Sequence, residues 1–212
     1  MQKRSPVKWT LAAATVDPGT DAFDPRPLIP YMESLGIKYH FLSERIFTRA
    51  KTEMQGSSIC SYCSRMKRGT LYGCCRDNGY NVLALAQHLD DLAESFIMSA
   101  LHNGQVRTMK ANYLIQAGAI RVIRPLVYVR EAEMKKFSYG AKLPVINENC
   151  PACFQEPRER HRVKKLLAQE ESIFPDLFGT LRRTLTPLMD ESIYNKIAEI
   201  RSEVSKRGNR KK

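Results

Sequence analysis

Short apolar runs alternate with segments of helical periodicity along most of this chain. Four runs have the length and continuity of strands buried in a parallel sheet: 7–16, 37–42, 81–86 and 120–124. The intervening and following segments predict four helices: 28–35, 64–76, a helix that Asp90 or Asp91 caps and that ends near Leu101, and 130–139. Strands that alternate with helices predict an α/β fold, a parallel sheet with helices on both faces.

Helical spacing continues beyond this alternating part. After a short extended piece at 144–147, helices are predicted at 157–171, 176–186 and 190–206. We therefore expect an α/β domain over residues 1–155, a helical C-terminal extension over 156–206 and a basic disordered tail over 207–212.

Length and composition limit the class of protein. The 212 residues are 43% hydrophobic, enough for one sizeable core, and no apolar stretch is long enough to span a bilayer. Six cysteines, four of them in tight pairs, fit metal or redox chemistry better than a secreted disulfide scaffold. We expect a soluble cytoplasmic protein without a membrane partner; an organellar location becomes the expectation if an upstream segment is missing.

The basic excess points to a polyanionic partner. The formal net charge is +12 and the pI is near 9.5, and Lys and Arg gain affinity for phosphates by releasing counterions. Arg158, Arg162 and Lys165 in the first C-terminal helix are the candidate RNA-binding residues. Each basic cluster taken singly also fits a solvated helix face, so it is the overall excess that favours nucleic acid.

Two Cys-x-x-Cys pairs are the most informative chemical feature. Cys60 and Cys63 form the first pair, and Cys150 and Cys153 form the second. Two thiolates three residues apart share a helix face and suit a single metal or cluster. Zinc ribbons usually bring their pairs within about 12–25 residues, whereas here residues 64–149 intervene, so an iron–sulfur cluster or a redox dithiol is favoured over zinc.

An acidic motif follows the third predicted strand. His88, Asp90 and Asp91 fall at the carboxyl end of that strand, where parallel sheets bind ligands. Paired carboxylates there suit Mg²⁺ bridging nucleotide phosphates. The alternative is that Asp90 only caps the following helix. The indication from His88 is weaker.

Four motifs in order resemble a known family. They are Cys60-Ser-Tyr-Cys63-Ser-Arg-Met-Lys67-Arg-Gly-Thr-Leu-Tyr72, Ala86-Gln-His-Leu-Asp-Asp-Leu-Ala-Glu94, Ile123-Arg-Pro-Leu126 and Asn149-Cys-Pro-Ala-Cys153. Together, over about residues 9–170, they resemble the tRNA 2-thiocytidine synthetases, ATP-dependent tRNA sulfurtransferases of the PP-loop superfamily. The resemblance implies an adenine nucleotide alpha-hydrolase-like fold.

The resemblance also implies a chemistry. ATP activates C2 of an anticodon-loop cytidine as an adenylate, and sulfur carried on a [4Fe-4S] cluster displaces AMP to give 2-thiocytidine. By resemblance, Cys60 and Cys63 are cluster ligands and the third is Cys150 or Cys153. Asp90 matches the ATP and Mg²⁺ position, and Lys67 is either a residue facing the adenylate or an exposed helix residue. The implied partners are tRNA, ATP and a sulfur donor such as a cysteine desulfurase system, and a homodimer is possible.

One family motif is missing. No Gly-Gly or Gly-x-Gly occurs in the chain, so the phosphate-binding loop expected before Trp9 is absent. We expect a chain that is incomplete at its N-terminus or degenerate, and that is inactive alone. Two other functions remain open: a wobble-uridine tRNA thiolase, and a non-catalytic basic RNA-binding protein with a structural zinc site.

Overall fold

The structure is a computed structural model that describes residues 4–20, 23–53, 59–115, 120–146 and 159–190, with 192, 196 and 199; for Cys60 it describes the backbone alone. The chain forms two compact units, Met1–Tyr80 with Ser138–Glu156, and Asn81–Phe137 with Pro157–Lys212. The sequence-based division between residues 155 and 156 follows chain order, whereas these units do not. Each unit is described by itself.

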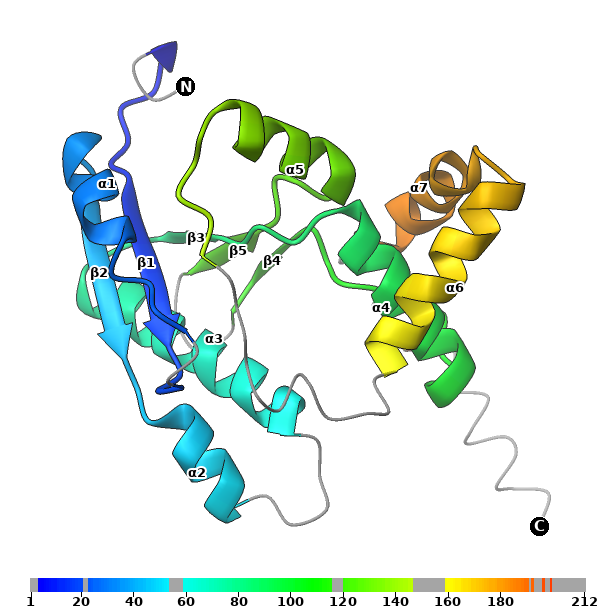
Figure 1. Cartoon of the computed structure of the whole chain (residues 1–212), viewed down its shortest axis with the longest axis horizontal. Coiled ribbons are helices and arrows are strands. Elements are labelled where there is room, and N and C mark those ends of the chain that lie inside the picture. Colours follow the sequence, from blue (N-terminus) through cyan, green and yellow to red (C-terminus); the bar gives the residue numbers. More distant parts are fainter. Residues whose placement is uncertain are drawn as a thin grey trace. The chain divides into compact units, whose positions relative to one another are not determined.

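The first unit contains a parallel pair of strands. β1 (Ala12–Asp17) pairs with β2 (Lys38–Ser43) from Ala12 opposite Lys38 to Asp17 opposite Ser43, and α1 (Leu28–Ser34) connects them (Figure 1). The turn after β1 requires a glycine, because Gly19 has φ +76° and a Cβ there would lie 2.9 Å from the carbonyl oxygen of Glu44.

Two helices complete the first unit. α2 (Ile46–Glu53) occupies a segment for which the pattern predicted no helix, and it buries Ile46, Phe47 and Ala50. α3 (Ile59–Asp77) begins five residues before the predicted start at Ser64 and therefore carries the first cysteine pair on its first two turns.

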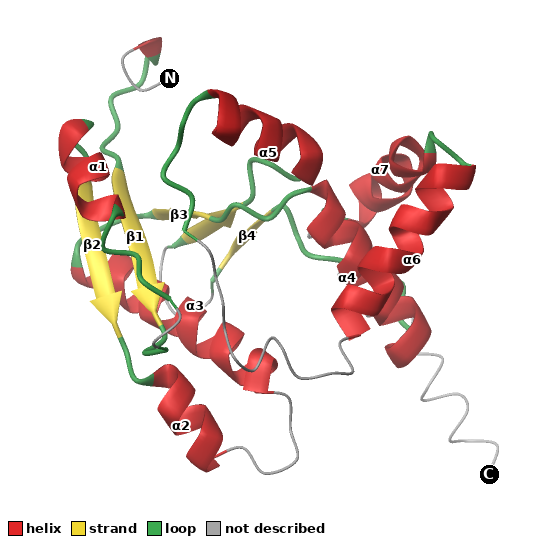
Figure 2. Ribbon diagram, in the orientation of Figure 1, coloured by secondary structure: helices red, strands yellow, loops and turns green. Residues whose placement is uncertain are grey.

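The second unit contains a mixed sheet (Figure 2). β3 (Val82–Ala84) and β5 (Arg121–Ile123) pair in parallel. β4 (Asn112–Leu114), which the pattern did not predict, pairs antiparallel to β5 with Tyr113 opposite Val122. A three-residue strand at a sheet edge buries little surface, so its own hydrophobic pattern carries little signal.

Helices of the second unit share one core. They are α4 (Leu89–Asn103), α6 (Glu159–Ile173) and α7 (Leu177–Leu188). α5 (Glu131–Gly140), a helix that the boundary between the units crosses, contributes no buried residue to this core. Leu92 of α4, Val163 of α6 and Leu185 of α7 are completely buried in this core. Figure 1 shows α4, α6 and α7 packed side by side, so the two C-terminal helices are held by apolar contact with α4.

The α/β class is confirmed, with corrections to single elements. The first strand begins at Ala12 and not at residue 7, and Val7, Trp9 and Leu11 are exposed ahead of it. Residues 144–146 join no strand. The predicted helix at 190–206 and the tail 207–212 lie largely or wholly outside the described residues. None of the described helices is long and apolar enough to cross a membrane.

Candidate functional site

The carboxyl ends of β3 and β5 are linked by a buried arginine. Because the two strands are parallel, the residues that follow them emerge at the same edge of the sheet. Arg124, only 6% exposed, donates from Nε to the side-chain oxygen of Gln87 at 2.9 Å and from Nη1 to the carbonyl of Lys110. The loop that leads into α4 is thus fixed by a guanidinium from the neighbouring strand.

His88 begins α4 as its N-cap. Its Nδ1 accepts from the backbone N–H of Asp91 at 3.4 Å, and the Asp91 carboxylate accepts from the backbone N–H of His88 at 3.1 Å, which completes a capping box. The prediction that Asp90 or Asp91 is the N-cap was therefore wrong, since Asp91 is the third helical residue of the box. Nε2 of the same ring lies 3.4 Å from Oδ2 of Asp91.

Asp90 is buried and fully engaged by protein groups. Its carboxylate accepts from Nε of Arg130 at 3.2 and 3.3 Å and from the backbone N–H of Glu131 at 2.8 Å. The second contact places a negative charge at the start of α5, where the helix dipole favours it. Asp90 therefore joins the N-terminal ends of α4 and α5.

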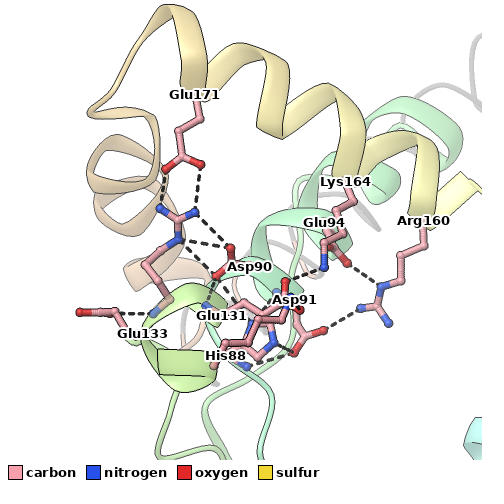
Figure 3. A network of polar contacts seen from close by, with 11 residues as sticks. His88, Asp90, Asp91, Glu94, Glu131, Glu133, Arg160, Lys164 and Glu171 are labelled. Atoms are coloured by element: carbon pink, nitrogen blue, oxygen red, sulfur yellow. Dashed lines mark hydrogen bonds and ion pairs between the residues drawn. The ribbon is translucent and has the colours of Figure 1, made fainter. Parts of the chain in front are cut away.

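Arg130 is the centre of this network, and Figure 3 labels its two carboxylate partners, Asp90 and Glu171. Its two terminal nitrogens donate to the two oxygens of Glu171 in α6 at 2.6 and 3.1 Å. Its guanidinium carbon also lies 3.3 Å from the ring centroid of Phe178 in α7. A planar, five-donor side chain can satisfy two carboxylates and stack at the same time, so Arg130 ties four helices together.

A second cation reaches the motif from α6. Arg160 donates to Glu94 at 2.8 Å and lies 3.5 Å from Asp91, while its own side chain is 54% exposed (Figure 3). Burial raises the pKa of Glu94, and the nearby charge of Asp91 adds to that effect, whereas Arg160 opposes it. Of Asp90 and Asp91, Asp91 is therefore the carboxylate whose cationic partner is accessible to solvent.

Glu131 makes a similar link between α5 and α6. Burial works against its charged form, but hydrogen bonds from Lys164 and Lys135 lower the pKa of Glu131 to about 2. These groups line a pocket of about 220 Å³ between helices of the second unit, together with Asp90, Glu94, Arg130, Glu171, Phe178 and three other residues. Every charged side chain named in that lining has an oppositely charged partner within the network.

The described residues do not by themselves form a metal site. Among them, no three His, Cys, Asp or Glu side chains converge on a point where they could hold an ion. The oxygens of Asp90 are taken by Arg130 and Glu131, and one oxygen of Asp91 is taken by His88. A Mg²⁺ ion held mainly by water and nucleotide phosphates would find only Asp91 available for exchange.

The first cysteine pair lies at the start of α3. Cys60 and Cys63 are its second and fifth residues, so they share one helix face, and the dipole at this end favours thiolates. Cys63 is half-buried and in no disulfide. Cys150 and Cys153 lie outside the described residues.

The other cysteines and Lys67 belong to the body of α3. Cys75 is buried in the core, and burial raises the pKa of both its thiol and that of Cys74, so both favour the neutral thiol. Lys67 is half-buried, with its ammonium 5.9 Å from the ring centroid of Phe23. Both findings concern the first unit alone.

The predicted RNA-binding residues of α6 are exposed. Arg162 donates to Glu159 at 2.9 Å and remains largely in solvent. Lys165 is exposed and has no ion pair with any residue that the structure describes. Arg158 lies outside the described residues.

Sequence reasoning missed Arg130, Arg160, Glu94, Glu171 and Arg124 as parts of the site. A signal existed for two of them, because Arg124 and Glu94 fall within the motifs that carried the family resemblance. The others pair across 40 or more residues of chain, and helical periodicity alone does not show which cation meets which carboxylate.

Comparison with known proteins gives three findings. A sequence profile described as a PP-loop domain (ATP_bind_3) matches residues 42–169. The tRNA-cytidine(32) 2-sulfurtransferase of Geobacter sulfurreducens is 36% identical over 186 residues, which cover 87% of this chain and 72% of that protein. The protein of the same name from Shewanella oneidensis is 34% identical over 85% of this chain and 58% of its own length.

The fold is similar to a solved structure. The U34-tRNA thiolase NcsA from Methanococcus maripaludis with its [4Fe-4S] cluster superposes with a TM-score of 0.71 at 21% identity, over 89% of this chain and 64% of the thiolase chain. At that identity the likeness establishes the fold.

Proposed function

Because the chain belongs to the PP-loop family that includes the tRNA-cytidine(32) 2-sulfurtransferases, we propose that it serves ATP-dependent thiolation of a tRNA cytidine. The substrate nucleotide in this proposal is cytidine 32, taken from the names of the relatives. The product is 2-thiocytidine.

The proposed reaction has two steps. The C2 oxygen of the cytidine attacks the α-phosphate of ATP, which releases pyrophosphate and leaves an adenylate on the base. Sulfide then adds at C2, and AMP leaves with the original oxygen. A bound [4Fe-4S] cluster with one iron free of protein ligands would supply the sulfur, which a donor such as a cysteine desulfurase system would renew.

The observation that carries the proposal is the position of Cys60 and Cys63. Both lie on the first two turns of α3, three residues apart, which suits two thiolate ligands of one cluster. The pair supplies too few ligands alone, so the proposal needs Cys150 or Cys153 as the third. A protein with all four thiolates on one metal would leave no open position, which is the zinc alternative.

For the nucleotide, we propose that the two aspartates divide the work. Asp90 was expected to face ATP, but its contacts suit it to holding α5 against α4. Asp91 retains a partner that can be exchanged, so we assign the nucleotide side to Asp91 with His88 as its support. Lys67 stays a candidate for contact with the adenylate.

Anaerobic reconstitution tests the proposal. The chain is incubated with ferrous iron and sulfide, and iron, sulfide and zinc are then measured. We expect a brown protein with iron and sulfide in equal amounts, and loss of both in Cys60→Ala and Cys63→Ala. Cys74→Ala is the matched control on the same helix and should keep the colour. Stoichiometric zinc without iron would contradict the proposal and favour the structural zinc site.

The wobble-uridine reaction is a second candidate, since the fold is similar to a U34-tRNA thiolase. Nucleoside analysis of tRNA separates the two: a strain lacking the protein should lose 2-thiocytidine if the proposal holds, or 2-thiouridine if the second candidate does.

A further inference from the structure

Tyr139 is the most exposed large hydrophobic side chain among the described residues. It lies at the C-terminal end of α5 and is 88% exposed. An isolated exposed aromatic ring is ordinary, but two further exposed residues, Lys142 and Val145, follow Tyr139 on the same short turn. We call Tyr139, Lys142 and Val145 the α5 turn surface; all three belong to the first unit.

The backbone of this turn is hydrogen-bonded and contains an unusual conformation. Leu143 N–H donates to the carbonyl of Ser138 at 2.9 Å, and Lys142 N–H donates to the carbonyl of Tyr139 at 3.1 Å, which closes the helix end. The left-handed position of this closure, with φ +49°, is filled by Lys142, the only non-glycine with positive φ among the described residues. Glycine normally holds such a position because a Cβ strains it.

A lysine at a backbone conformation that favours glycine indicates a functional role for the lysine side chain. Lys142 is exposed and makes no ion pair with any described residue, so it contributes nothing visible to the stability of the fold. The segment 138–146 contains no acidic residue. No acidic residue of this segment therefore balances the charge of Lys142, whose side chain is exposed to solvent.

We propose that the α5 turn surface binds single-stranded RNA, with an unpaired base stacked on Tyr139 and its phosphate beside Lys142. The inference rests on the proposed tRNA substrate and names the part of that RNA which this surface takes: a splayed loop nucleotide, not a duplex. An aromatic ring and a cation three residues apart on one turn match the π-face and the phosphate of one nucleotide. Backbone hydrogen bonds already restrict this turn, which lowers the entropy lost on binding.

Binding of two RNAs by the full 212-residue chain tests this inference. The probes are a fluorescently labelled anticodon stem-loop and a blunt duplex of the same base composition, measured by anisotropy over a series of salt concentrations. Tyr139→Ala should weaken binding of the stem-loop by roughly 5- to 150-fold, since stacking is worth about 1–3 kcal/mol per base, and should leave its salt dependence unchanged. Tyr139→Phe should restore it.

Tyr128→Ala is the matched control, because Tyr128 is another exposed tyrosine, at 51%, on a different turn. It should leave the affinity within about twofold of the parent chain, and Tyr139→Ala should change duplex binding no more than this control does. Lys142→Gln should lower the slope of log affinity against log salt by about 0.7, the value for one phosphate of a single strand.

Lys142→Gly gives a signature that a structural role cannot produce. It removes the same charge and also relieves the left-handed strain, so it should raise the Tm by roughly 2–4 °C while lowering the RNA affinity as Lys142→Gln does.

If the stem-loop binds but neither Tyr139→Ala nor Lys142→Gly weakens it, the inference is wrong and the tRNA proposal survives. If no variant or parent binds the stem-loop, the proposed function fails as well. Equal losses for stem-loop and duplex would overturn the base-stacking assignment.

Discussion

The guanidinium of Arg130 lies over the ring of Phe178, with 3.3 Å between the guanidinium carbon and the ring centroid, while its nitrogens donate to Asp90 and Glu171. Arginine is suited to this combination because its planar fork donates in the plane and stacks through its face. The carboxylates belong to α4 and α6 and the ring to α7, so one side chain sets the mutual position of elements from residue 90 to residue 178.

Removing Arg130 should strongly destabilise the protein. Arg130→Ala leaves the buried Asp90 carboxylate without its cation, which costs about 3–5 kcal/mol, and Arg130→Lys should recover only part of that because a lysine can neither fork nor stack. Urea denaturation followed by circular dichroism measures the change. Arg183→Ala is the control, since its pair with Asp176 is exposed at both ends and should be worth at most about 1 kcal/mol. Equal losses for the two variants would contradict the central role of Arg130.

Glu131 should stabilise the fold in a defined acid range. Its pKa is lowered to about 2 in the folded protein, against an ordinary value of 4.5, so its contribution is complete above pH 4.5 and disappears as the pH falls towards 2. Glu131→Gln should therefore lose roughly 1 kcal/mol at pH 7, an amount discounted for the half-exposed Lys164, and almost nothing near pH 2. Denaturation at a series of pH values measures this; a difference that is independent of pH would refute it.

Glu94 should show the opposite dependence. Burial raises its pKa, so the folded state holds the proton more tightly than the unfolded chain, and stability falls as the pH rises above the ordinary value of 4.5. Glu94→Gln lacks this loss, so relative to the parent chain it should become more stable between pH 4 and pH 7. The same titration series checks the sign. A Glu94→Gln variant that loses relative stability over that range would show that Arg160 outweighs burial.

The surroundings of Glu131 and Glu94 illustrate which parts of the site the sequence could predict and which it could not. The acidic motif after β3 was predictable, because a short apolar run followed by His88, Asp90 and Asp91 is a strand-end pattern. Its internal roles were not, since they depend on Arg130, which immediately precedes α5, and on Arg160 and Lys164 of α6, all 39 or more residues beyond Asp91. Periodicity placed those helices to within two residues at each end but carried no information on which faces meet.

Short elements set by tertiary contact escaped prediction for the same reason. β4 exists because Tyr113 pairs opposite Val122 of β5, and Arg124 covers the ring of Tyr113 at 5.5 Å. The capping of α4 was misjudged because His88 is an uncommon N-cap, and the box became visible only once its Nδ1 was placed 3.4 Å from Asp91 N.

The exposed lysine of α6 should contribute more to tRNA binding than its neighbouring arginine. Lys165 has no described ion-pair partner, whereas Arg162 must first leave Glu159 before it can meet a phosphate. Lys165→Glu should weaken tRNA binding several-fold and reduce the salt slope by about 1, with a smaller effect for Arg162→Glu. Anisotropy titrations measure both, with Arg26→Glu as a control for an exposed, paired arginine of the other unit. The ranking fails if Arg162→Glu has the larger effect.

The last prediction concerns ATP. Phosphates of a nucleotide are usually held by backbone N–H groups of a glycine-rich loop, and a displacement of about 1 Å can reduce the rate about a hundredfold. The 212 residues contain 11 glycines but no two of them adjacent or separated by one residue. In our proposal the motif that remains for ATP is the strand end with Asp91, whose ion-pair partner Arg160 must be displaced or shared. We therefore expect the 212-residue chain alone to bind ATP weakly and not to form 2-thiocytidine. Equilibrium dialysis should give a Kd for ATP of about 1 mM or above, equivalent to a binding free energy of roughly −4 kcal/mol.

Asp91→Asn should reduce this residual ATP binding further, whereas Asp90→Asn should mainly lower the stability of the fold. Micromolar ATP affinity, or thiolation by the chain alone, would show that groups other than a glycine-rich loop hold the phosphates.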